Sequence, residues 1–425
     1  MGRCVRLAVL VVGISLVASN AAVASREHPR VVRENPANFT PRLRADNAVG
    51  HPHMDAFSRS RGTVYAGGTF RTVSNAAATR TYRRHHVLAF DATTGAMRSF
   101  APKVDGPIWA VQAVGKAVYL GGSFRHVNGV RRIGLAKVDA RTGKVRRRFN
   151  ADFPGGRVNE IRRVDGRLLV GGSFPQALVA LRPRTGRNTG YLRLRVRGEI
   201  SGSWGRTAVY RFAVSPDDNR LVAVGNFTTV SGKSRKRAFM VGLRDNRGRL
   251  ARWYYRAFRK PCSSTDARRV AYLQDVDFSP RGGYFVVVST GQISRRGDLG
   301  ETVCDAAARF ETDVRRPRRP TWINYTGGDS VWSVAATGAA VYVQGHFKWL
   351  DNARGYQDDP VATAVRRRGI GAINSRTGKA LAWNPDKPAR IGGKDMMATG
   401  SGLWVGSDSK RFNGEPRRGV AFAPL

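Results

Sequence analysis

The stretch Val118-Tyr119-Leu120-Gly121-Gly122-Ser123-Phe124 decides the fold of this 425-residue chain. It is a short apolar run that ends in Gly-Gly-x-Phe, and related stretches return along the chain at intervals of roughly 50 to 64 residues. The seven copies, two of them degenerate, lie at 64–70, 118–124, 168–174, 222–227, 285–291, 341–347 and 403–408. A fixed period of this length is typical of repeat architectures in which each repeat is one supersecondary unit.

Each copy belongs to a longer unit, seen best around residue 120. A strand with apolar alternation precedes it at 108–114, and a third strand follows at 134–139. That strand ends in the turn Asp139-Ala140-Arg141-Thr142-Gly143, after which 144–150 reads as a fourth strand. Four short strands per unit predict a propeller blade. We therefore expect an all-β chain forming a seven-bladed β-propeller of four-stranded antiparallel blades. Stacked β-sandwiches are the alternative, but they need longer strands and no fixed period.

The two ends of the chain predict how the ring closes. The last repeat stops at 419–425, which matches a third strand, so its fourth strand is missing. Residues 36–41 resemble the fourth-strand ends at 149–150 and 383–385. We expect residues 36–42 to pair with the strand around 420–423, because this completes the last blade and removes open sheet edges.

The first residues read as a secretory signal peptide. Arg3 and Arg6 precede an apolar run at 7–18, and Ala22-Val23-Ala24 is a small-residue cleavage site. We therefore expect a secreted protein with a signal peptide at 1–24 and one propeller domain at 25–425. No other apolar stretch reaches 18 residues, so we expect no transmembrane segment.

Two of the three cysteines, Cys262 and Cys304, lie in the predicted mature chain. An even pair in an oxidising compartment predicts one disulfide, with two free thiols as the alternative. Both cysteines fall in loops expected on the same face of the propeller, which is what a bridge between them requires.

The repeats resemble the bacterial GG-x-F propeller repeat of secreted proteins, a fold related to WD-repeat and quinoprotein propellers. The best match runs from Gly121-Gly122-Ser123-Phe124 through 135–139 and 142–143 to Phe149-Asn150. The resemblance covers nearly the whole mature chain and is weakest in the fifth repeat, where 289–292 loses the motif. It implies a fold and carries no catalytic signature.

Net charge points to anionic partners. The formal charge is +43, from 73 basic and 30 acidic residues, although part of the arginine excess can reflect genome composition. The predicted second-to-third strand loops hold 22 basic and seven acidic residues within 80. We take as candidate binding residues the basic runs of two such loops: Lys233, Arg235, Lys236, Arg237, Arg366, Arg367 and Arg368. A merely solvated basic surface is the alternative reading.

Residue patterns for chemistry are weak, and we predict no catalytic residue, metal or cofactor. His51-x-His53 beside Asp55 reads as a surface loop rather than a metal site. Asp275 and Asp277 share one side of a strand and suggest acid–base chemistry in a central channel, but bonds to backbone, or pairing with Arg268 or Arg269, explain them as well. Gln357-Asp358-Asp359 could offer oxygens to Ca²⁺, but it reads as a solvated loop.

The sequence thus predicts a secreted, monomeric, non-catalytic propeller that binds an anionic polymer or a protein partner through its basic loop face. A polysaccharide hydrolase or lyase with its site at the central channel is the alternative, and an envelope scaffold without a defined ligand is a third. Acidic residues and histidine facing the channel would favour the enzyme.

Overall fold

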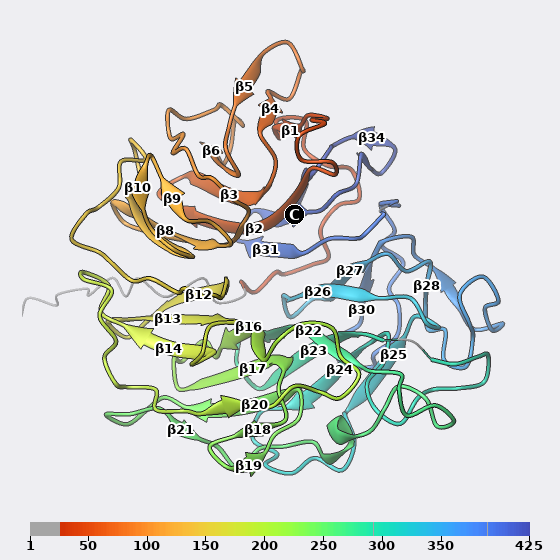
Figure 1. Ribbon diagram of the computed structural model, residues 1–425. Coiled ribbons are helices and arrows are strands. Elements are labelled where there is room, and N and C mark those ends of the chain that lie inside the picture. Colours follow the sequence, from red (N-terminus) through yellow and green to blue (C-terminus); the bar gives the residue numbers. More distant parts are fainter. Residues whose placement is uncertain (1–25, 292, 389) are drawn as a thin grey trace, which may run out of the picture.

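The computed structural model describes residues 26–291, 293–388 and 390–425, so the expected signal peptide lies outside the described residues (Figure 1). The described chain is all-β, apart from one turn of 3₁₀ helix, η1 (Arg256–Arg259). Within this part no helix is long and apolar enough to span a bilayer.

Seven antiparallel sheets of three or four strands, here named sheet 1 to sheet 7 in chain order, make up most of the described structure. Each sheet runs first strand, second strand, third strand from inside to outside, and in Figure 1 the labelled first strands lie nearest the middle of the molecule. The first strands are β2 (His53–Ser60), β7 (Ile108–Val114), β12 (Val158–Val164), β16 (Ala208–Val214), β22 (Tyr272–Phe278), β26 (Val331–Ala336) and β31 (Asp395–Thr399). The second strands are β3 (Thr63–Thr69), β8 (Ala117–Gly122), β13 (Arg167–Gly172), β17 (Arg220–Asn226), β23 (Tyr284–Thr290), β27 (Val341–Gly345) and β32 (Gly402–Gly406). The third strands are β6 (Val87–Asp91), β11 (Leu135–Asp139), β14 (Leu178–Leu181), β20 (Ala238–Gly242), β24 (Ala306–Glu311), β30 (Ile370–Ile373) and β35 (Val420–Pro424).

A regular fourth strand forms in only two sheets, β21 (Arg249–Leu250) in sheet 4 and β25 (Trp322–Tyr325) in sheet 5, so the expectation of four strands throughout is wrong. In sheet 2 the expected strand at 144–150 makes one bridge, between Val138 and Val145. The side chain of Asp139 accepts the amides of Arg141 and Thr142 (3.0 and 2.8 Å), which fixes a tight turn. The chain then bends away, because the ring of Phe149 enters the core between sheets.

The Gly-Gly pair at the end of the second strands serves close packing in two directions. A Cβ on Gly121 would meet Val158 at 2.5 Å, on the first strand of the next sheet. A Cβ on Gly122 would meet the carbonyl oxygen of Pro107 at 2.1 Å, just before the first strand of its own sheet. Any side chain would therefore push neighbouring strands apart, and this explains why the motif repeats.

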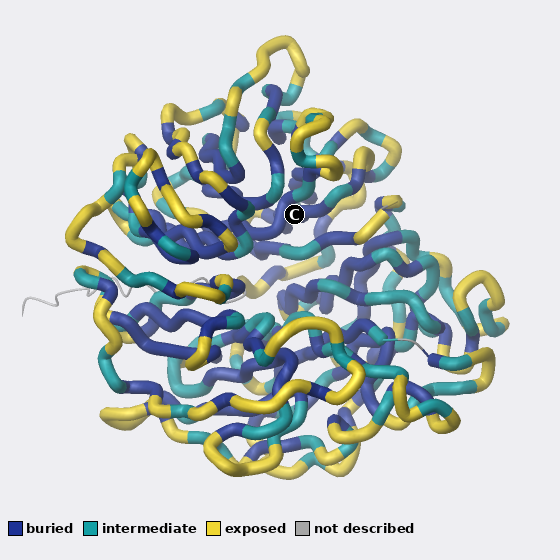
Figure 2. The backbone as a smooth tube through the Cα atoms, viewed as in Figure 1, coloured by how far each residue is buried: buried dark blue, intermediate teal, exposed yellow. Residues whose placement is uncertain are grey.

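The first strands contact one another in chain order, and β31 of sheet 7 also contacts β2 of sheet 1. Polar side chains reinforce these contacts: Asp277 accepts the amide of Ala336 (2.8 Å) on the next sheet. Across the junction of sheets 7 and 1, Asp395 accepts the amide of Phe57 (2.6 Å). Apolar clusters fill the space between sheets, and Figure 2 shows the strands buried and the connecting tips exposed.

The N-terminal segment lies along the outer edge of sheet 7, where the sequence predicts it, but residues 36–41 form no regular strand there. The amides of Arg33, Ala37 and Leu43 donate to the carbonyls of Pro424, Phe422 and Arg418 (2.7, 2.8 and 2.9 Å). The ring of Phe39 contacts Trp404 and Phe422 of the same sheet. Residues more than 370 apart in sequence are thereby held in one unit.

Short hairpins follow most second strands and lie at the periphery of Figure 1. They are built from β4 (Thr72–Ser74) and β5 (Thr81–Arg83), β9 (His126–Val127) and β10 (Val130–Arg131), β18 (Thr229–Val230) and β19 (Lys233–Ser234), β28 (Trp349–Leu350) and β29 (Val365–Arg366), and β33 (Arg411–Phe412) and β34 (Glu415–Pro416). Two of these hairpins gain a third short strand from the segment that precedes their sheet: β1 (Arg42–Leu43) pairs with β4, and β15 (Val196–Arg197) pairs with β18.

One arginine after each of these hairpins links two segments of its sheet, and we call it a strap arginine. Its guanidinium donates to the preceding carbonyl and to a carbonyl of the segment beyond the third strand. The five arginines are Arg84, Arg132, Arg235, Arg367 and Arg417. In sheet 7 the second acceptor is Ala37, so the N-terminal segment occupies the place that Arg147 occupies in sheet 2.

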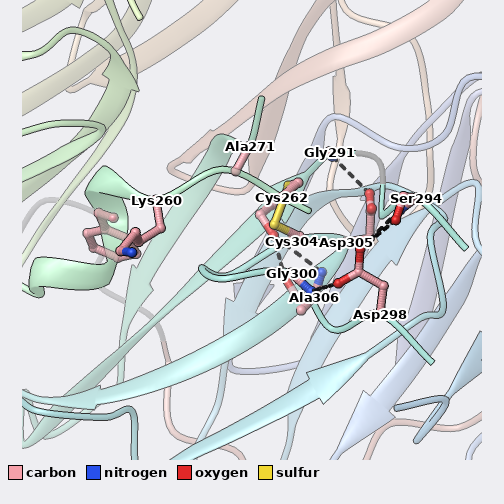
Figure 3. Close-up of a disulfide and its surroundings, with 12 residues drawn as sticks. Lys260, Cys262, Ala271, Gly291, Ser294, Asp298, Gly300, Cys304, Asp305 and Ala306 are labelled. Carbon is pink, nitrogen blue, oxygen red and sulfur yellow. Dashed lines mark hydrogen bonds between the residues drawn. A yellow bond between two sulfur atoms is a disulfide. The ribbon is translucent and has the colours of Figure 1, made fainter. Parts of the chain in front are cut away.

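The Cys262–Cys304 disulfide that the sequence predicts is present, with the two Cα atoms 5.6 Å apart. It joins the connection between sheets 4 and 5 to the residues just before β24 (Figure 3). Both cysteines are buried, and beside them Asp305 accepts the amide of Gly291 (2.8 Å). The bridge therefore anchors a long connection that contains little regular structure.

Replacing both cysteines by serine is expected to lower the free energy of unfolding by roughly 3 to 4 kcal/mol, because the bridge closes a long loop in the unfolded chain. The two cysteines are 42 residues apart. Urea unfolding with and without a reducing agent measures the loss, and the reducing agent should leave the double variant unchanged. Two thiols that react freely in the unreduced native protein would contradict the bridge.

Candidate functional site in the central cavity

A cavity of about 550 Å³ opens where the first strands begin, and we name it the central cavity. Its lining combines aromatic, charged and amide side chains from every sheet. These residues are His53, Asp55, Trp109, Arg157, Asn159, Trp204, Tyr210, Arg211, Tyr272, Gln274, Thr290, Trp332, Ile391, Gly392, Lys394 and Asp408.

A recurring β-bulge directs side chains into this cavity. In six first strands the pairing with the second strand skips one residue near the start of the strand. The skipped residues are Asp55, Trp109, Asn159, Tyr210, Gln274 and Trp332, and Lys394 stands at the matching place just before β31. A bulge re-aims one side chain, and all seven of these residues line the cavity. The repeat thus supplies seven equivalent positions occupied by seven side chains of differing chemistry.

Aromatic rings form much of the wall. Trp109, Tyr210 and Trp332 come from bulges, and Tyr272 begins the first strand of sheet 5. Trp204 stands at the mouth and is 85% exposed, while its amide donates to the Tyr272 hydroxyl (2.9 Å). An exposed tryptophan beside a ring-lined cavity is typical of a ligand-binding surface.

Two cations lie against these rings. The guanidinium of Arg157 is 4.2 Å from the ring centroid of Trp109, and the ammonium of Lys394 is 3.4 Å from that of Trp332. Burial lowers the pKa of Lys394 to about 8, the neighbouring charges of Arg211 and Arg157 add to the lowering, and Asp55 and Asp408 oppose it. Lys394 is therefore close to its neutral form under mildly alkaline conditions.

His53 and Asp55 form an ion pair at the cavity wall, with Nε2 and Oδ2 3.2 Å apart. The other ring nitrogen, Nδ1, is 2.8 Å from the carbonyl oxygen of His51. Burial alone would lower the pKa of His53, but the Asp55 carboxylate and the His51 carbonyl together raise it above its ordinary value. Because both ring nitrogens face acceptors, the protonated imidazolium suits this place.

Arg211 forms the floor of the central cavity. From sheet 4 its guanidinium reaches across to the carbonyls of Lys394, Asp55, Asn159 and Trp109 (3.1, 3.2, 3.3 and 3.4 Å), in sheets 7, 1, 3 and 2. It also pairs with Glu160 (3.0 Å), whose side chain is only 3% exposed. Arginine suits this position because its planar fork carries five donors at fixed angles.

Two further carboxylates interact with Arg211. Burial raises the pKa of Asp275 to about 8 and that of Asp395 to about 7, and in both cases the charge of Arg211 counteracts the rise. Asp275 accepts the amides of Val276 and Val334 (2.9 and 3.0 Å). The backbone bonds considered for Asp275 and Asp277 are therefore formed, whereas Arg268 and Arg269 pair with Asp266 instead.

The seven basic residues singled out from the sequence lie in two separate sheets. Lys233, Arg235, Lys236 and Arg237 follow the second strand of sheet 4, and Arg366, Arg367 and Arg368 that of sheet 6. Lys233 and Arg366 are exposed. Arg235 and Arg367 are strap arginines, bonded to carbonyls of their own sheets. Lys236 donates to the carbonyl of Arg259 (3.3 Å), and Arg368 pairs with Asp386 (2.8 Å).

Arg237 is the most buried of the seven, at 1% exposure. Its guanidinium donates to the carbonyls of Ala271, Phe258 and Lys260, which ties sheet 4 to the η1 connection. Its backbone is left-handed (φ 71°) where the matching position of sheet 6 carries Gly369. The basic run around Arg237 thus mixes a fold-holding side chain with exposed ones.

Other residues considered for metals are occupied by partners within the protein. Asp358 pairs with Lys348 (2.5 Å) and Asp359 with Arg296 (2.9 Å). His51 and His53 are close in space, but only His53 lines the cavity. In the described ranges no group of three or more histidine, cysteine or acidic side chains is arranged to hold a metal ion.

Sequence reasoning missed most residues of the central cavity. Trp109 and Trp332 are the large aromatic residues of mostly apolar first strands, and Asp55, Asn159 and Gln274 are polar residues at the matching place. Aligning the seven first strands would have shown one column that is never aliphatic. That column is the signal that could have located the site.

Comparisons with known proteins give a fold and no family. No protein-family model matches the chain, and no curated protein matches it. One solved structure, described as the structure of U3-55K, is similar over 92% of this chain and 100% of its own, at 10% identity and a TM-score of 0.52. A computationally designed protein, Ika8, covers 95% of this chain and 100% of its own, at 10% identity and a TM-score of 0.45. The chain therefore shares an overall fold with U3-55K.

Proposed function

We propose that sheets 1 to 7 are the blades of one seven-bladed β-propeller of the GG-x-F type, and that this secreted protein binds an anionic polysaccharide in its central cavity. The circular order of contacts among first strands supports the propeller, as does the N-terminal segment on sheet 7. The disulfide is compatible with an extracellular location.

The observation that carries the binding function is the convergence of seven equivalent bulge positions on one cavity. Aromatic rings offer stacking faces to sugar rings, and amides and carboxylates offer hydrogen bonds to hydroxyl groups. Arg157 forms no ion pair with any described carboxylate, so it can receive an acidic group of the ligand.

The hairpins that carry Lys233 and Arg366 have a supporting role in this proposal and do not form the binding site. Cavity and hairpins lie on the same side of the sheets, because both are reached where second strands end. Exposed cations such as Lys233 and Arg366 attract a polyanion over a distance set by salt, of roughly 8 to 10 Å at moderate ionic strength. We therefore propose that the exposed hairpin cations attract the polymer and that the central cavity recognises its sugar units.

Titrating the mature protein with oligogalacturonate, followed by tryptophan fluorescence, tests the proposal. Trp332→Ala and Arg157→Gln are each expected to weaken binding about tenfold, equivalent to ~1.4 kcal/mol. Trp349→Ala, in a hairpin outside the cavity, is the matched aromatic control and should bind like the parent protein.

Two charge variants separate attraction from recognition. Lys233→Ser with Arg366→Ser removes two exposed hairpin charges, and Arg141→Ser with Arg376→Ser removes two from turns at the other ends of the sheets. The hairpin pair should slow association and flatten the salt dependence more than the turn pair. Unchanged affinity in both cavity variants would contradict the cavity site, and tighter binding of single-stranded DNA would contradict the glycan.

A further inference from the structure

The central cavity is lined by the amine of Lys394 and the imidazole of His53. We propose that the protein cleaves 1→4-linked uronic-acid polysaccharides by β-elimination, with Lys394 as the base and His53 as the acid. The inference rests on the proposed function, since the substrate must first occupy the central cavity.

Lys394 is placed to abstract a proton from a bound sugar. Lys394 is the residue just before β31, and its side chain lines the cavity. Its ammonium nitrogen lies over Trp332, 3.4 Å from the ring centroid. The charged groups that act on it are Asp55, Asp408, Arg211 and Arg157. With its pKa lowered to about 8, a large share of Lys394 is neutral in mildly alkaline solution, as a general base must be.

His53 is placed to return a proton. Its ring is fixed on one side by the His51 carbonyl and on the other by Asp55 (2.8 and 3.2 Å). The Asp55 carboxylate and the His51 carbonyl raise the pKa of His53 above its ordinary value, which favours the imidazolium, and Lys394 is the cation that opposes this. The pKa of His53 is raised and that of Lys394 is lowered, so the two shifts bring the acid and the base closer to a common working pH.

The carboxylates around the cavity are poor candidates for glycoside hydrolysis, which requires one carboxylic acid and one free carboxylate. Asp55 is paired with His53, and Asp408 accepts the amides of Ile391 and Gly392 (2.7 and 3.2 Å). Asp275 accepts hydrogen bonds from two backbone amides and interacts with the charge of Arg211, the floor of the cavity. Elimination needs no free carboxylate, and so it fits the groups present.

A uronic acid supplies what elimination requires, a proton made acidic by an adjacent carboxylate. A cation must stabilise the negative charge that develops on that carboxylate. Arg157 is such a cation, held on the face of Trp109 and forming no ion pair with a described carboxylate. Neutral glucans lack this carboxylate and are not substrates in this scheme.

The step balances without a further reactant. The neutral amine of Lys394 takes the proton from C5 of the uronate, and the electrons of that C–H bond form a C4=C5 double bond. The C4–O4 bond breaks, and its electrons go to O4, which takes the proton that Nε2 of His53 otherwise shares with Asp55. The products are an unsaturated uronate at one new end and a free reducing end at the other.

Ultraviolet absorbance of the new double bond, conjugated with the carboxylate, tests the proposal on polygalacturonate, alginate and heparosan. We expect the parent protein to act on one of these, with a rate that passes through a maximum as pH rises, because higher pH frees the base Lys394 (pKa about 8) but deprotonates the acid His53. Lys394→Arg keeps the positive charge but cannot act as a base, and should lower the rate at least about a hundredfold while retaining binding. His53→Asn should cause a loss of similar size.

Lys116→Ala, an exposed lysine outside the central cavity, is the control and should retain full activity. Thermal unfolding of each variant shows whether it is folded, and Lys394→Gln gives a second test if the arginine variant is not. Cavity-dependent binding of a uronate without any absorbance change would overturn the elimination and leave the binding function standing. Binding that ignores cavity substitutions would overturn both.

Discussion

Deleting residues 26–44 is expected to lower the thermal midpoint of unfolding by roughly 10 °C, and the free energy of unfolding by about 5 kcal/mol. The segment buries Val32 and Leu43 against sheet 7 and its neighbours, at 2% exposure each. It also supplies backbone donors to the carbonyls of Pro424, Phe422 and Arg418. A loss of this size is a large part of the 5 to 15 kcal/mol typical of native proteins.

Calorimetry of the deletion variant measures this effect. Arg30→Ala with Arg33→Ala, two exposed side chains of the same segment, is the control and should shift stability by less than about 0.5 kcal/mol. An unchanged midpoint after the deletion would mean that sheet 7 is stable with an open edge and that the segment contributes nothing to closure.

Replacing Arg211 by methionine is expected to cost about 3 to 5 kcal/mol, because it removes one of the two cations paired with the buried Glu160 and leaves several carbonyls without their donor. Glu160 keeps Arg162 as a partner, but the carbonyls of Asp55, Trp109, Asn159 and Lys394 lose theirs. The pKa values of Asp275 and Asp395 should rise further, since the charge of Arg211 lowers both.

Urea unfolding of Arg211→Met quantifies the loss, and Arg211→Lys is the informative companion. Lysine restores the charge but not the planar fork, so it should recover only part of the stability. Adding Glu160→Gln to the methionine variant should also recover part, because it removes a buried charge that has lost one of its two cationic partners. A urea midpoint equal to that of the parent protein would show that other donors serve these carbonyls.

The periodic sequence was sufficient to predict the second strands and the disulfide. Gly121-Gly122 could be interpreted because each glycine makes a local packing contact, with Val158 or with Pro107, and equivalent contacts return for the glycine pairs of the first and third repeats. The pairing of residues 36–42 with 420–423 followed from counting strands per repeat. The number of regular strands per sheet did not follow, because the bend after Val145 depends on Phe149 entering the core.

The candidate site was harder to predict, because basic residues in this chain are either exposed to solvent or buried as donors that hold the fold together. Lys233 and Arg237 stand four residues apart in one basic run, yet Lys233 is exposed and the guanidinium of Arg237 is buried among carbonyls. Sequence shows the charge but not the acceptor. The central cavity escaped detection for a related reason, since its bulge residues are one per repeat and come together only after the seven sheets are assembled.

The floor built by Arg211 has a consequence for how a long polymer could be handled. A side chain that spans the enclosed space from sheet 4 to sheets 1, 3 and 7 prevents a chain from threading through. In the proposed function, a polysaccharide enters and leaves by one mouth, so only its terminal units reach the bulge residues. Recognition is then exo in character: the number of binding sites on a polymer scales with its chain ends and not with its length, and shortening the polymer at constant mass should increase the protein bound.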